Sequence, residues 1–311
     1  MKENLKGEVN FRKKVVAQDM GEDQIEGWRS AEEMEDIIKD RVERLTHYYQ
    51  DYVKFGLDPA LELAAGRCQL SMVLKEKFNI KKVVATDISL DTLQSAKLFK
   101  TKLNFSKSLP DRIQCNIENL PFNDCTFKHV AIWAALHHFE NPKKAVSEVE
   151  RVLCHQGTFF VGGEPIKPIL KVPLLRLMEG AYESPSIMLR VLWKLRISAF
   201  FTKFVTKEEE FGVIENSFRP QEYDRYFKNF ERLFWFIIPN MESDFLKTIF
   251  SKEFRTNIYG GSLENALLRI QKKNRRDNEF SLRCPNCKTK EPLISAESGY
   301  GCPTCYKNYP I

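Results

Sequence analysis

LELAAGRC at residues 61–68 and VVATDIS at residues 83–89 decide the fold of this chain. The first is an apolar run that ends in small residues, the second is an apolar run that ends in an aspartate, and a helical pattern lies between them. A strand that turns tightly into a helix leaves backbone N–H groups free, and small residues let a ligand approach that backbone closely. Small residues also occur in any tight strand-to-helix turn, so this loop alone does not identify a ligand.

The same alternation of apolar runs and helical patterns continues along the chain. It predicts strands at 61–65, 83–87, 112–116, 128–134 and 158–162, helices at 70–78, 90–99 and 141–152, and two further strands at 232–238 and 266–273. Strands separated by helices form right-handed βαβ units, which build a mostly parallel, doubly wound sheet. The expected fold class is therefore α/β, with a seven-stranded sheet whose last two strands form an antiparallel pair.

Asp87 ends the second predicted strand and lies 21 residues after Gly66. A carboxylate at that position can accept hydrogen bonds from both hydroxyls of a ribose. A nicotinamide enzyme would share the small-residue loop and the aspartate, so these two features do not choose the cofactor.

The next segment indicates which cofactor is bound. CNIENLPFNDCTFKHVAIWAALHHFENPKKAVSEVERVLCHQGTFFV, residues 115–161, resembles the class I S-adenosylmethionine (SAM) dependent methyltransferases, in particular the type 11-like domain. In that family an acidic loop leads to LPF, an LHH-type stretch follows the fourth strand, and an EVERVL helix precedes a glycine turn. The resemblance is close over 57–164 and looser through the last two strands, and it implies a Rossmann-like fold and methyl transfer from SAM.

The resemblance also implies which residues hold SAM. Glu62 would organise the loop around the methionine amine, Asp87 would hold the ribose, and Asn116 stands where the family usually has an aspartate beside adenine. The two outer glycines of the family's loop are replaced by Ala64 and Cys68. Alanine is tolerable at position 64 if that residue has a φ below zero, whereas the side chain of Cys68 would narrow the approach of a ligand to the backbone. The implied cofactor contacts are Glu62, Ala64, Gly66, Asp87, Ile88, Asn116, Ile117 and Trp133.

The candidate catalytic residues are His137, His138 and Glu164. The methyl group of SAM is already electrophilic, so the protein must align a nucleophile and, for a hydroxyl or an acid, remove a proton. A histidine with a pKa near neutrality can serve as that base, but a histidine at this place can also be a structural cap or a SAM contact. Neither an Asn/Asp-Pro-Pro-aromatic tetrapeptide nor a cysteine stands at the end of the fourth predicted strand, which disfavours methylation of base amines and of pyrimidine C5.

Residues 164–230 interrupt the pattern of the sheet and are expected to form a helical insertion that covers the substrate side. Evenly spaced cations among apolar residues in 164–207 would suit an anionic or lipid-linked acceptor or peripheral membrane contact. A helix packed on the core with its cations in water explains the same pattern.

The C-terminal cysteines form two pairs, CPNC and CPTC, with 14 residues between them. Cys284, Cys287, Cys302 and Cys305 can place four thiolates around one zinc ion. With all four positions filled, this zinc would be structural, in a ribbon at 280–311. CPTCYKNYPI further resembles the small zinc-ribbon activator of tRNA, rRNA and protein methyltransferases, which implies a ribbon that stabilises the catalytic domain or presents its substrate.

Composition limits the remaining choices. The chain has 311 residues and a net charge of +6, which allows an anionic partner without requiring one. Residues 1–28 are expected to be a loosely ordered arm, 30–52 an amphipathic helix and 57–275 the catalytic domain. The sequence contains no transmembrane run or secretory signal, and we expect a cytoplasmic protein. The favoured acceptor is a small or carrier-linked molecule methylated on oxygen or nitrogen. RNA or protein acceptors, and a non-catalytic SAM-binding scaffold, are the alternatives.

Overall fold

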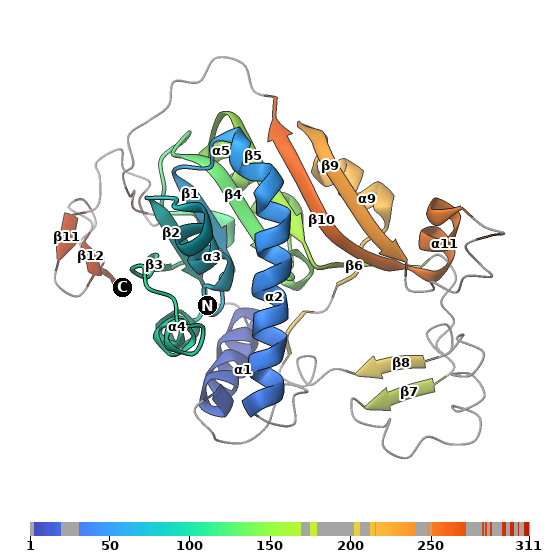
Figure 1. Ribbon diagram of the computed structural model, residues 1–311, viewed down its shortest axis with the longest axis horizontal. Coiled ribbons are helices and arrows are strands. Elements are labelled where there is room, and N and C mark those ends of the chain that lie inside the picture. Colours follow the sequence, from blue (N-terminus) through green and yellow to red (C-terminus); the bar gives the residue numbers. More distant parts are fainter. Residues whose placement is uncertain are drawn as a thin grey trace.

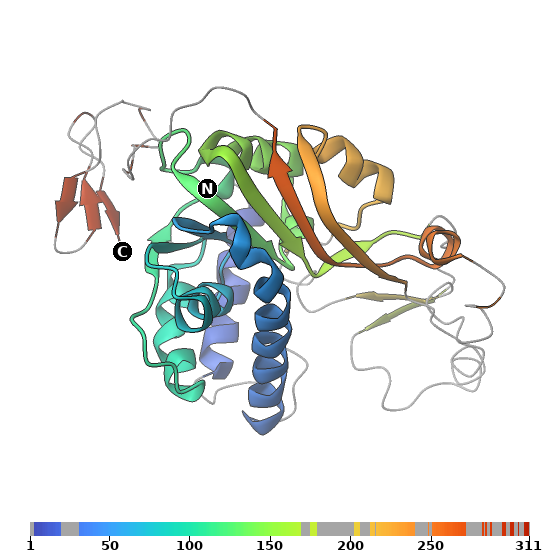
Figure 2. The same cartoon turned by 45° about the horizontal axis from the view of Figure 1, so that its top comes forward.

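A central twisted sheet with helices on both faces forms the body of the computed structural model (Figures 1 and 2). The structure describes residues 3–19, 31–168, 175–178, 202–205, 212–214, 216–239, 248, 251–271, 282, 284, 287, 294–296, 299–301, 304 and 308–310.

The sheet contains eight strands, in the order β3-β2-β1-β4-β5-β10-β6, with β9 paired to β10. Its strands are β1 (Ala60–Leu63), β2 (Val83–Asp87), β3 (Asp111–Gln114), β4 (Phe127–Trp133), β5 (Leu153–Gly162), β6 (Glu164–Ile166), β9 (Phe230–Pro239) and β10 (Gly261–Ile270). β1 to β5 are parallel, and β10 runs antiparallel to β5, β6 and β9. The predicted number of seven was wrong because the fifth run is split at Gly163, whose φ is +68°, and β5 and β6 pair with successive parts of β10.

Helices cover the two faces of the sheet with separate apolar clusters. Those described around the sheet are α2 (Ala31–Tyr52), α3 (Gln69–Phe78), α4 (Leu90–Lys102), α5 (Pro142–Val152), α9 (Pro220–Tyr226) and α11 (Lys252–Tyr259). α2 and α3 pack on one face, where Tyr49 and Val73 contact the cluster around Phe160. α5 and α9 pack on the other face through Val149 and Tyr223. The predicted strand and helix positions of the catalytic domain up to 162 are confirmed within a few residues.

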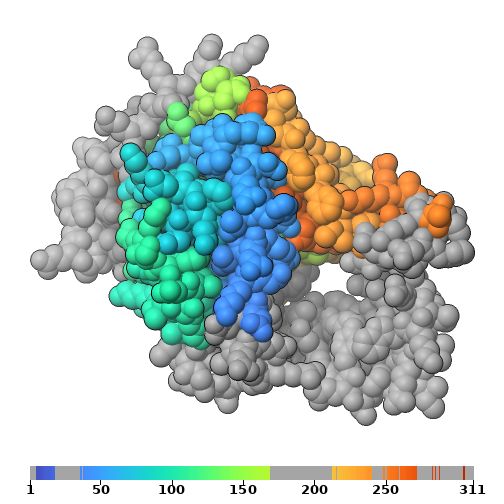
Figure 3. Space-filling model, in the orientation of Figure 1, coloured from blue at the N-terminus to red at the C-terminus, as the bar shows by residue number. Residues whose placement is uncertain are grey.

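Polar contacts under α2 fix its position on the sheet, and Figure 3 shows this helix (blue) as a ridge on the molecular surface. The hydroxyl of Tyr49 lies 2.7 Å from Nε2 of His129, and Nδ1 of His129 lies 2.8 Å from the hydroxyl of Thr158. Tyr52 donates to Oδ1 of Asn265 at 2.6 Å. These bonds satisfy polar atoms that are buried between the helix and strands β4, β5 and β10.

The N-terminal segment differs from the prediction. Residues Glu3–Asp19 form helix α1, which packs against α4, and not a loosely ordered arm. Phe11 and Val15 are buried against Val213, so a tertiary contact stabilises a helix whose own sequence pattern is weak.

The structure describes only parts of the predicted helical insertion at 164–230, and these parts contain both strands and a helix. β7 (Leu175–Met178) and β8 (Thr202–Val205) form a parallel pair, and only α9 is helical there. The residues between these elements, including most of the predicted cationic segment, lie outside the described part of the chain. None of the described helices is both long and apolar enough to cross a lipid bilayer.

Arg151 on α5 fixes the loop that contains the LPF motif. Its guanidinium donates to both carboxylate oxygens of Glu148 at 2.8 Å, and to the carbonyls of Phe122 at 2.7 Å and Leu120 at 3.1 Å. Glu148 in turn accepts from the backbone N–H of Leu120 at 2.8 Å. The EVERVL helix and the LPF loop therefore form one hydrogen-bonded unit.

The C-terminal segment includes a three-stranded antiparallel sheet of β11 (Ile294–Ala296), β12 (Gly299–Gly301) and β13 (Asn308–Pro310). Leu282 forms an antiparallel bridge with Phe122, and both Leu282 and Cys284 are buried in the main core cluster. The beginning of this segment is thus attached to the catalytic domain at the LPF loop.

Candidate functional site

The loop after β1 makes a tight turn over the edge of the sheet. Ala65 donates its backbone N–H to the carbonyl of Thr86 at 2.9 Å. Ala64, Gly66 and Cys68 have φ values of 47°, 51° and 59°. A φ below zero was the condition for tolerating alanine at position 64, and it is not met, because Ala64 is held in the left-handed region that glycine prefers. Cys68 does not narrow the approach either, because its side chain is fully buried in a core cluster under the loop.

Asp87 connects the first loop to the second. Its Oδ2 accepts the backbone N–H of Gly66 at 2.8 Å and its Oδ1 accepts the backbone N–H of Ser89 at 2.8 Å. Burial raises the pKa of Asp87, while these two N–H donors and the positive charge of Arg12 act against that rise. Each carboxylate oxygen of Asp87 keeps a further lone pair that can accept a hydrogen bond from a hydroxyl group of a ligand.

Glu62 lies at the buried end of β1, and its Oε2 accepts the backbone N–H of Ser71 at 2.8 Å. Burial raises the pKa of Glu62 to about 7, although hydrogen bonds from Ser71 oppose the change. A buried carboxylate in this state favours a cationic partner such as an amino acid ammonium group.

Asn116 begins the short turn after β3. Its Oδ1 accepts the backbone N–H of Glu118 at 2.9 Å and so caps the turn Ile117–Asn119. The oxygen retains one lone pair and the amide nitrogen remains a donor, so Asn116 can still bind a base edge. Ile117 and Ile88 provide apolar walls on the same side.

Trp133 forms the wall at the end of β4. Its ring stacks on Phe160 with centroids 6.0 Å apart and on Tyr48 with centroids 6.2 Å apart. A Cβ atom at Gly162 would lie 2.6 Å from this ring, so the glycine is required for the tryptophan to lie against the sheet.

Glu164 holds the loop that follows β4. Its Oε1 accepts the backbone N–H groups of Ala135 and Leu136, both at 2.9 Å, and its Oε2 accepts the backbone N–H of His137 at 3.1 Å. The same Oε2 lies 2.9 Å from Nδ1 of His137, and the carboxylate is completely buried. Because the Glu164 carboxylate accepts these three backbone hydrogen bonds, Nδ1 of His137 is the donor in its contact with Oε2. The ring nitrogen with a free lone pair is then Nε2 of His137.

His138 lies beside this pair. The His137 and His138 rings are 4.0 Å apart between centroids, and Nδ1 of His138 lies 3.0 Å from the carbonyl of Ile214. The carbonyl of His137 accepts the backbone N–H of Asn216 at 2.9 Å. Ile214 and Asn216 therefore hold the two histidines.

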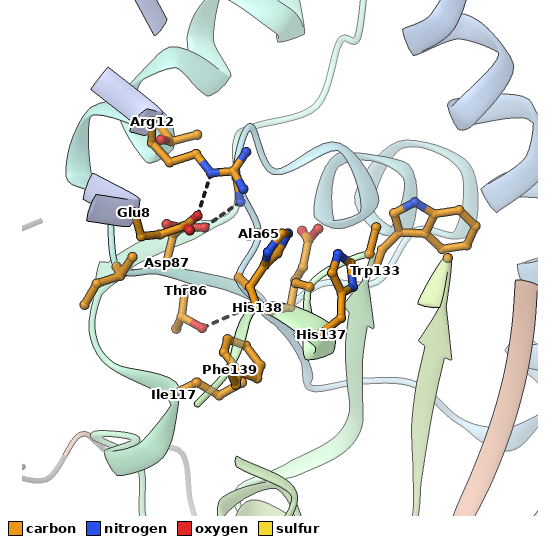
Figure 4. Close-up of a pocket in the computed structure, with 18 of the residues that line it drawn as sticks. Glu8, Arg12, Ala65, Thr86, Asp87, Ile117, Trp133, His137, His138 and Phe139 are labelled. Carbon is orange, nitrogen blue, oxygen red and sulfur yellow. Dashed lines mark hydrogen bonds and ion pairs between the residues drawn. The ribbon is translucent and has the colours of Figure 1, made fainter. Parts of the chain in front are cut away.

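These elements enclose one cavity of about 680 Å³ (Figure 4). It is lined by all the predicted cofactor residues, Glu62, Ala64, Gly66, Asp87, Ile88, Asn116, Ile117 and Trp133, together with His137 and His138. Glu164 lies behind the histidines and does not line it. The volume lies within the usual range for ligand sites, about 300–1,000 Å³.

Sequence reasoning missed helix α1, and it did not place the predicted helix α2 or strand β10 at this cavity. The additional lining residues include Leu5, Glu8, Arg12 and Val15 of α1, Ile38, Arg41 and Leu45 of α2, and Gly261 and Ser262 of β10. The Glu8 and Arg12 spacing on a helix was the available signal, because residues four apart share one face.

The predicted zinc site lies only partly within the described chain. Cys284 is buried and Cys287 is exposed, while Cys302 and Cys305 lie outside the described residues. Among the residues that the structure describes, no group of three or more histidine, cysteine, aspartate or glutamate side chains is arranged to hold a metal ion.

Residues 61–161 match the family model described as a methyltransferase domain. No curated protein matches the chain. Several solved structures do. A putative sarcosine dimethylglycine methyltransferase from Galdieria sulphuraria is 14% identical, with a TM-score of 0.51 over 84% of this chain and 98% of that chain.

Two other similar structures have lower TM-scores. Magnesium protoporphyrin IX methyltransferase from Synechocystis PCC 6803, solved with bound SAH (S-adenosylhomocysteine), is 13% identical over 82% of this chain and 92% of that chain, with a TM-score of 0.46. A complex between the Haloferax volcanii Trm112 methyltransferase activator and a putative methyltransferase gives 15% identity over 86% of this chain and 99% of that chain, with a TM-score of 0.48.

The structural likeness at these identities shows the fold, and the family match shows what the domain does. Residues 61–161 are a methyltransferase domain, and the chain is a SAM-dependent methyltransferase.

Proposed function

We propose that this methyltransferase methylates an oxygen or nitrogen atom of a small-molecule or carrier-linked acceptor in the cytoplasm. The observation that carries the proposal is the buried Glu164–His137 pair, whose Nδ1–Oε2 distance is 2.9 Å, at the edge of the cavity. Acceptor hydroxyls and acids lose a proton during methyl transfer, and an oriented imidazole can take it.

SAM supplies an electrophilic methyl group on a sulfonium, and the residues on the cavity wall fit it. Glu62 would face the ammonium of its methionine part, Asp87 the ribose, and Asn116 with Ile117 the adenine. Gly66 supplies a backbone without a Cβ next to the sugar; a Cβ there would meet only Thr92, at 3.9 Å, so the space above this loop is open.

His137 is the proposed general base, and Glu164 is a positioning residue for it. The carboxylate of Glu164 is fully buried and is occupied by the donors of the 135–137 loop, so it orients the imidazole and does not reach the acceptor. His138 lies next to His137 and would contact the acceptor or the cofactor. These roles refine the candidates from the sequence, where Glu164 was a catalytic candidate.

A cavity of about 680 Å³ supports a small acceptor. Near the histidines its lining includes the apolar residues Phe139, Pro165 and Ile214 and the hydroxyl of Ser262, and charged side chains such as Arg41 and Glu140 line it as well. RNA or protein methylation is the competing function, supported by the attachment of Leu282 to Phe122, which brings the C-terminal segment to the catalytic domain.

We also propose that the C-terminal segment 280–311 is a zinc ribbon. The support is the spacing of the two CxxC pairs and the small antiparallel sheet β11–β12–β13 that lies between and after them. The four thiolates of Cys284, Cys287, Cys302 and Cys305 would give the closed coordination of a structural ion.

The test combines methyl-labelled SAM, fractionated cell extract and two variants. We expect label in the small-molecule fraction, and we expect His137→Gln to lower the rate of transfer by roughly 10²- to 10⁴-fold. Glu164→Gln should lower it as well, and the dissociation constant for SAH should change less than about twofold in the His137 variant because that residue acts on the acceptor. Label in RNA or protein would show that the acceptor is a macromolecule and not a small molecule. An unchanged rate in His137→Gln would overturn the assignment of His137 as the general base.

A further inference from the structure

Helix α1 contributes a carboxylate to the wall where Asp87 lies. Glu8 and Arg12 line the same cavity as Asp87, and Figure 4 shows the carboxyl groups of Glu8 and Asp87 side by side below the guanidinium of Arg12. Nε of Arg12 donates to Oε1 of Glu8 at 2.7 Å, and these side chains are only 21% and 17% exposed. We propose that Glu8 is a second sugar-binding residue, which accepts a hydrogen bond from one hydroxyl of the SAM ribose while Asp87 accepts one from the other.

The charges at this place support a ligand that donates hydrogen bonds. Two carboxylates that face one cavity repel each other, and the charge of Arg12 lowers the pKa of Asp87 while that of Glu8 raises it. A vicinal diol can donate one hydrogen bond to each of the two carboxylates, which lowers the cost of placing them in one cavity.

The hydrogen bonds that Asp87 already makes point to the same arrangement. One lone pair on each of its oxygens is used by the N–H groups of Gly66 and Ser89. These two bonds hold the two loops together and fix the carboxylate of Asp87. Asp87 therefore has little freedom to turn toward both hydroxyls of the ribose. A second acceptor from α1 removes the need for Asp87 to serve both.

The packing of α1 keeps Glu8 in place. Phe11 and Val15 are almost completely buried against Val213, on the face next to the one that carries Glu8 and Arg12. A surface ion pair between residues four apart would not need this anchoring, because an exposed pair contributes little to helix stability. The anchored helix and the shared cavity together favour a binding role.

The inference rests on the SAM assignment and is independent of the acceptor. Its test is isothermal titration calorimetry with three probes: SAH, 2′-deoxy-SAH and 3′-deoxy-SAH. For the unchanged protein we expect each deoxy analogue to bind roughly tenfold to hundredfold more weakly than SAH. For Glu8→Gln we expect SAH to bind about tenfold more weakly, and one of the two analogues to bind about as well as SAH does.

Lys13→Gln is the matched control, because Lys13 is on the exposed face of the same helix and its change should leave all three constants as they were. An equal loss for all three probes in Glu8→Gln would mean a general effect on the helix and would overturn the proposal, as would unchanged constants. Absence of SAH binding to the unchanged protein would instead refute the SAM site itself and Glu8 with it, which separates the two failures.

Discussion

The protonation state of Glu62 is expected to change when the cofactor binds. Its carboxyl group is buried beside the N–H of Ser71 and near the charge of Asp87, and burial raises its pKa to about 7. A cationic ammonium close to it would favour the ionised form and lower the pKa in the complex. Binding below pH 7 therefore has to remove a proton from Glu62.

The expected result is a pH-dependent affinity for SAH. From pH 7 down to pH 6 the dissociation constant should rise roughly fivefold, because about half of Glu62 is ionised at pH 7 and about a tenth at pH 6 when its pKa is about 7. Calorimetry at each pH measures it, and repeating the titration in buffers of different ionisation enthalpy counts the released proton. Glu62→Gln should bind weakly with no such slope. A wild-type constant that stays level between pH 6 and 7 would contradict the role of Glu62.

The residues that line this part of the cavity could be predicted, but the geometry of their loop could not. The spacing of Glu62, Gly66 and Asp87 follows from strands that end at one edge of a parallel sheet, and all three line the cavity. The positive φ of Ala64 was not predictable, because it depends on tertiary bonds such as that from Ala65 to Thr86. Local propensity favours a negative φ for alanine, and the surrounding structure overrides it.

At the scale of elements, apolar runs predicted the strands well because strands buried on both faces read as continuous apolar segments. Helix α1 was missed for the opposite reason. Its stability comes from packing against α4 and from the contact of Phe11 and Val15 with Val213, none of which is visible in its own sequence. The split at Gly163 was missed because one glycine in a strand pattern does not show that the strand is interrupted.

Arg151 gives an element-scale prediction. It joins α5 to the LPF loop through Glu148 and the carbonyls of Phe122 and Leu120, and its side chain is 16% exposed. Arg151→Lys cannot keep the paired bonds to Glu148 and the two carbonyls, so we expect a loss of about 2–3 kcal/mol in the free energy of unfolding. Urea denaturation at pH 7 measures it.

Arg269→Lys is the control for this change. Arg269 lies 3.8 Å from Glu231, with side chains 28% and 47% exposed, and such a pair contributes at most about 1 kcal/mol. Equal effects of the two substitutions would show that the Arg151 network does not hold the loop.

At the scale of the whole molecule, two buried groups have opposite effects on the free energy of unfolding when the pH falls. Burial lowers the pKa of His129 to about 3, so acidification below its unfolded pKa of about 6.5 favours the unfolded state. Burial raises the pKa of Glu62 to about 7, so acidification toward its unfolded pKa of about 4.5 favours the folded state. Between pH 7.5 and 5 each effect amounts to about 2 kcal/mol, and their signs are opposite.

The prediction concerns the change in the free energy of unfolding from pH 7.5 to pH 5, measured by urea denaturation. Glu62→Gln leaves the His129 effect unopposed, so this variant should lose about 2 kcal/mol more than the unchanged protein on acidification. His129→Gln should gain about 2 kcal/mol relative to the unchanged protein over the same range, whatever its absolute stability. The double variant should return to the slope of the unchanged protein, because the contributions of Glu62 on β1 and His129 on β4, which nearly cancel in the unchanged protein, are then both absent. Single variants whose slopes match that of the unchanged protein would show that these two buried groups do not set its response to pH.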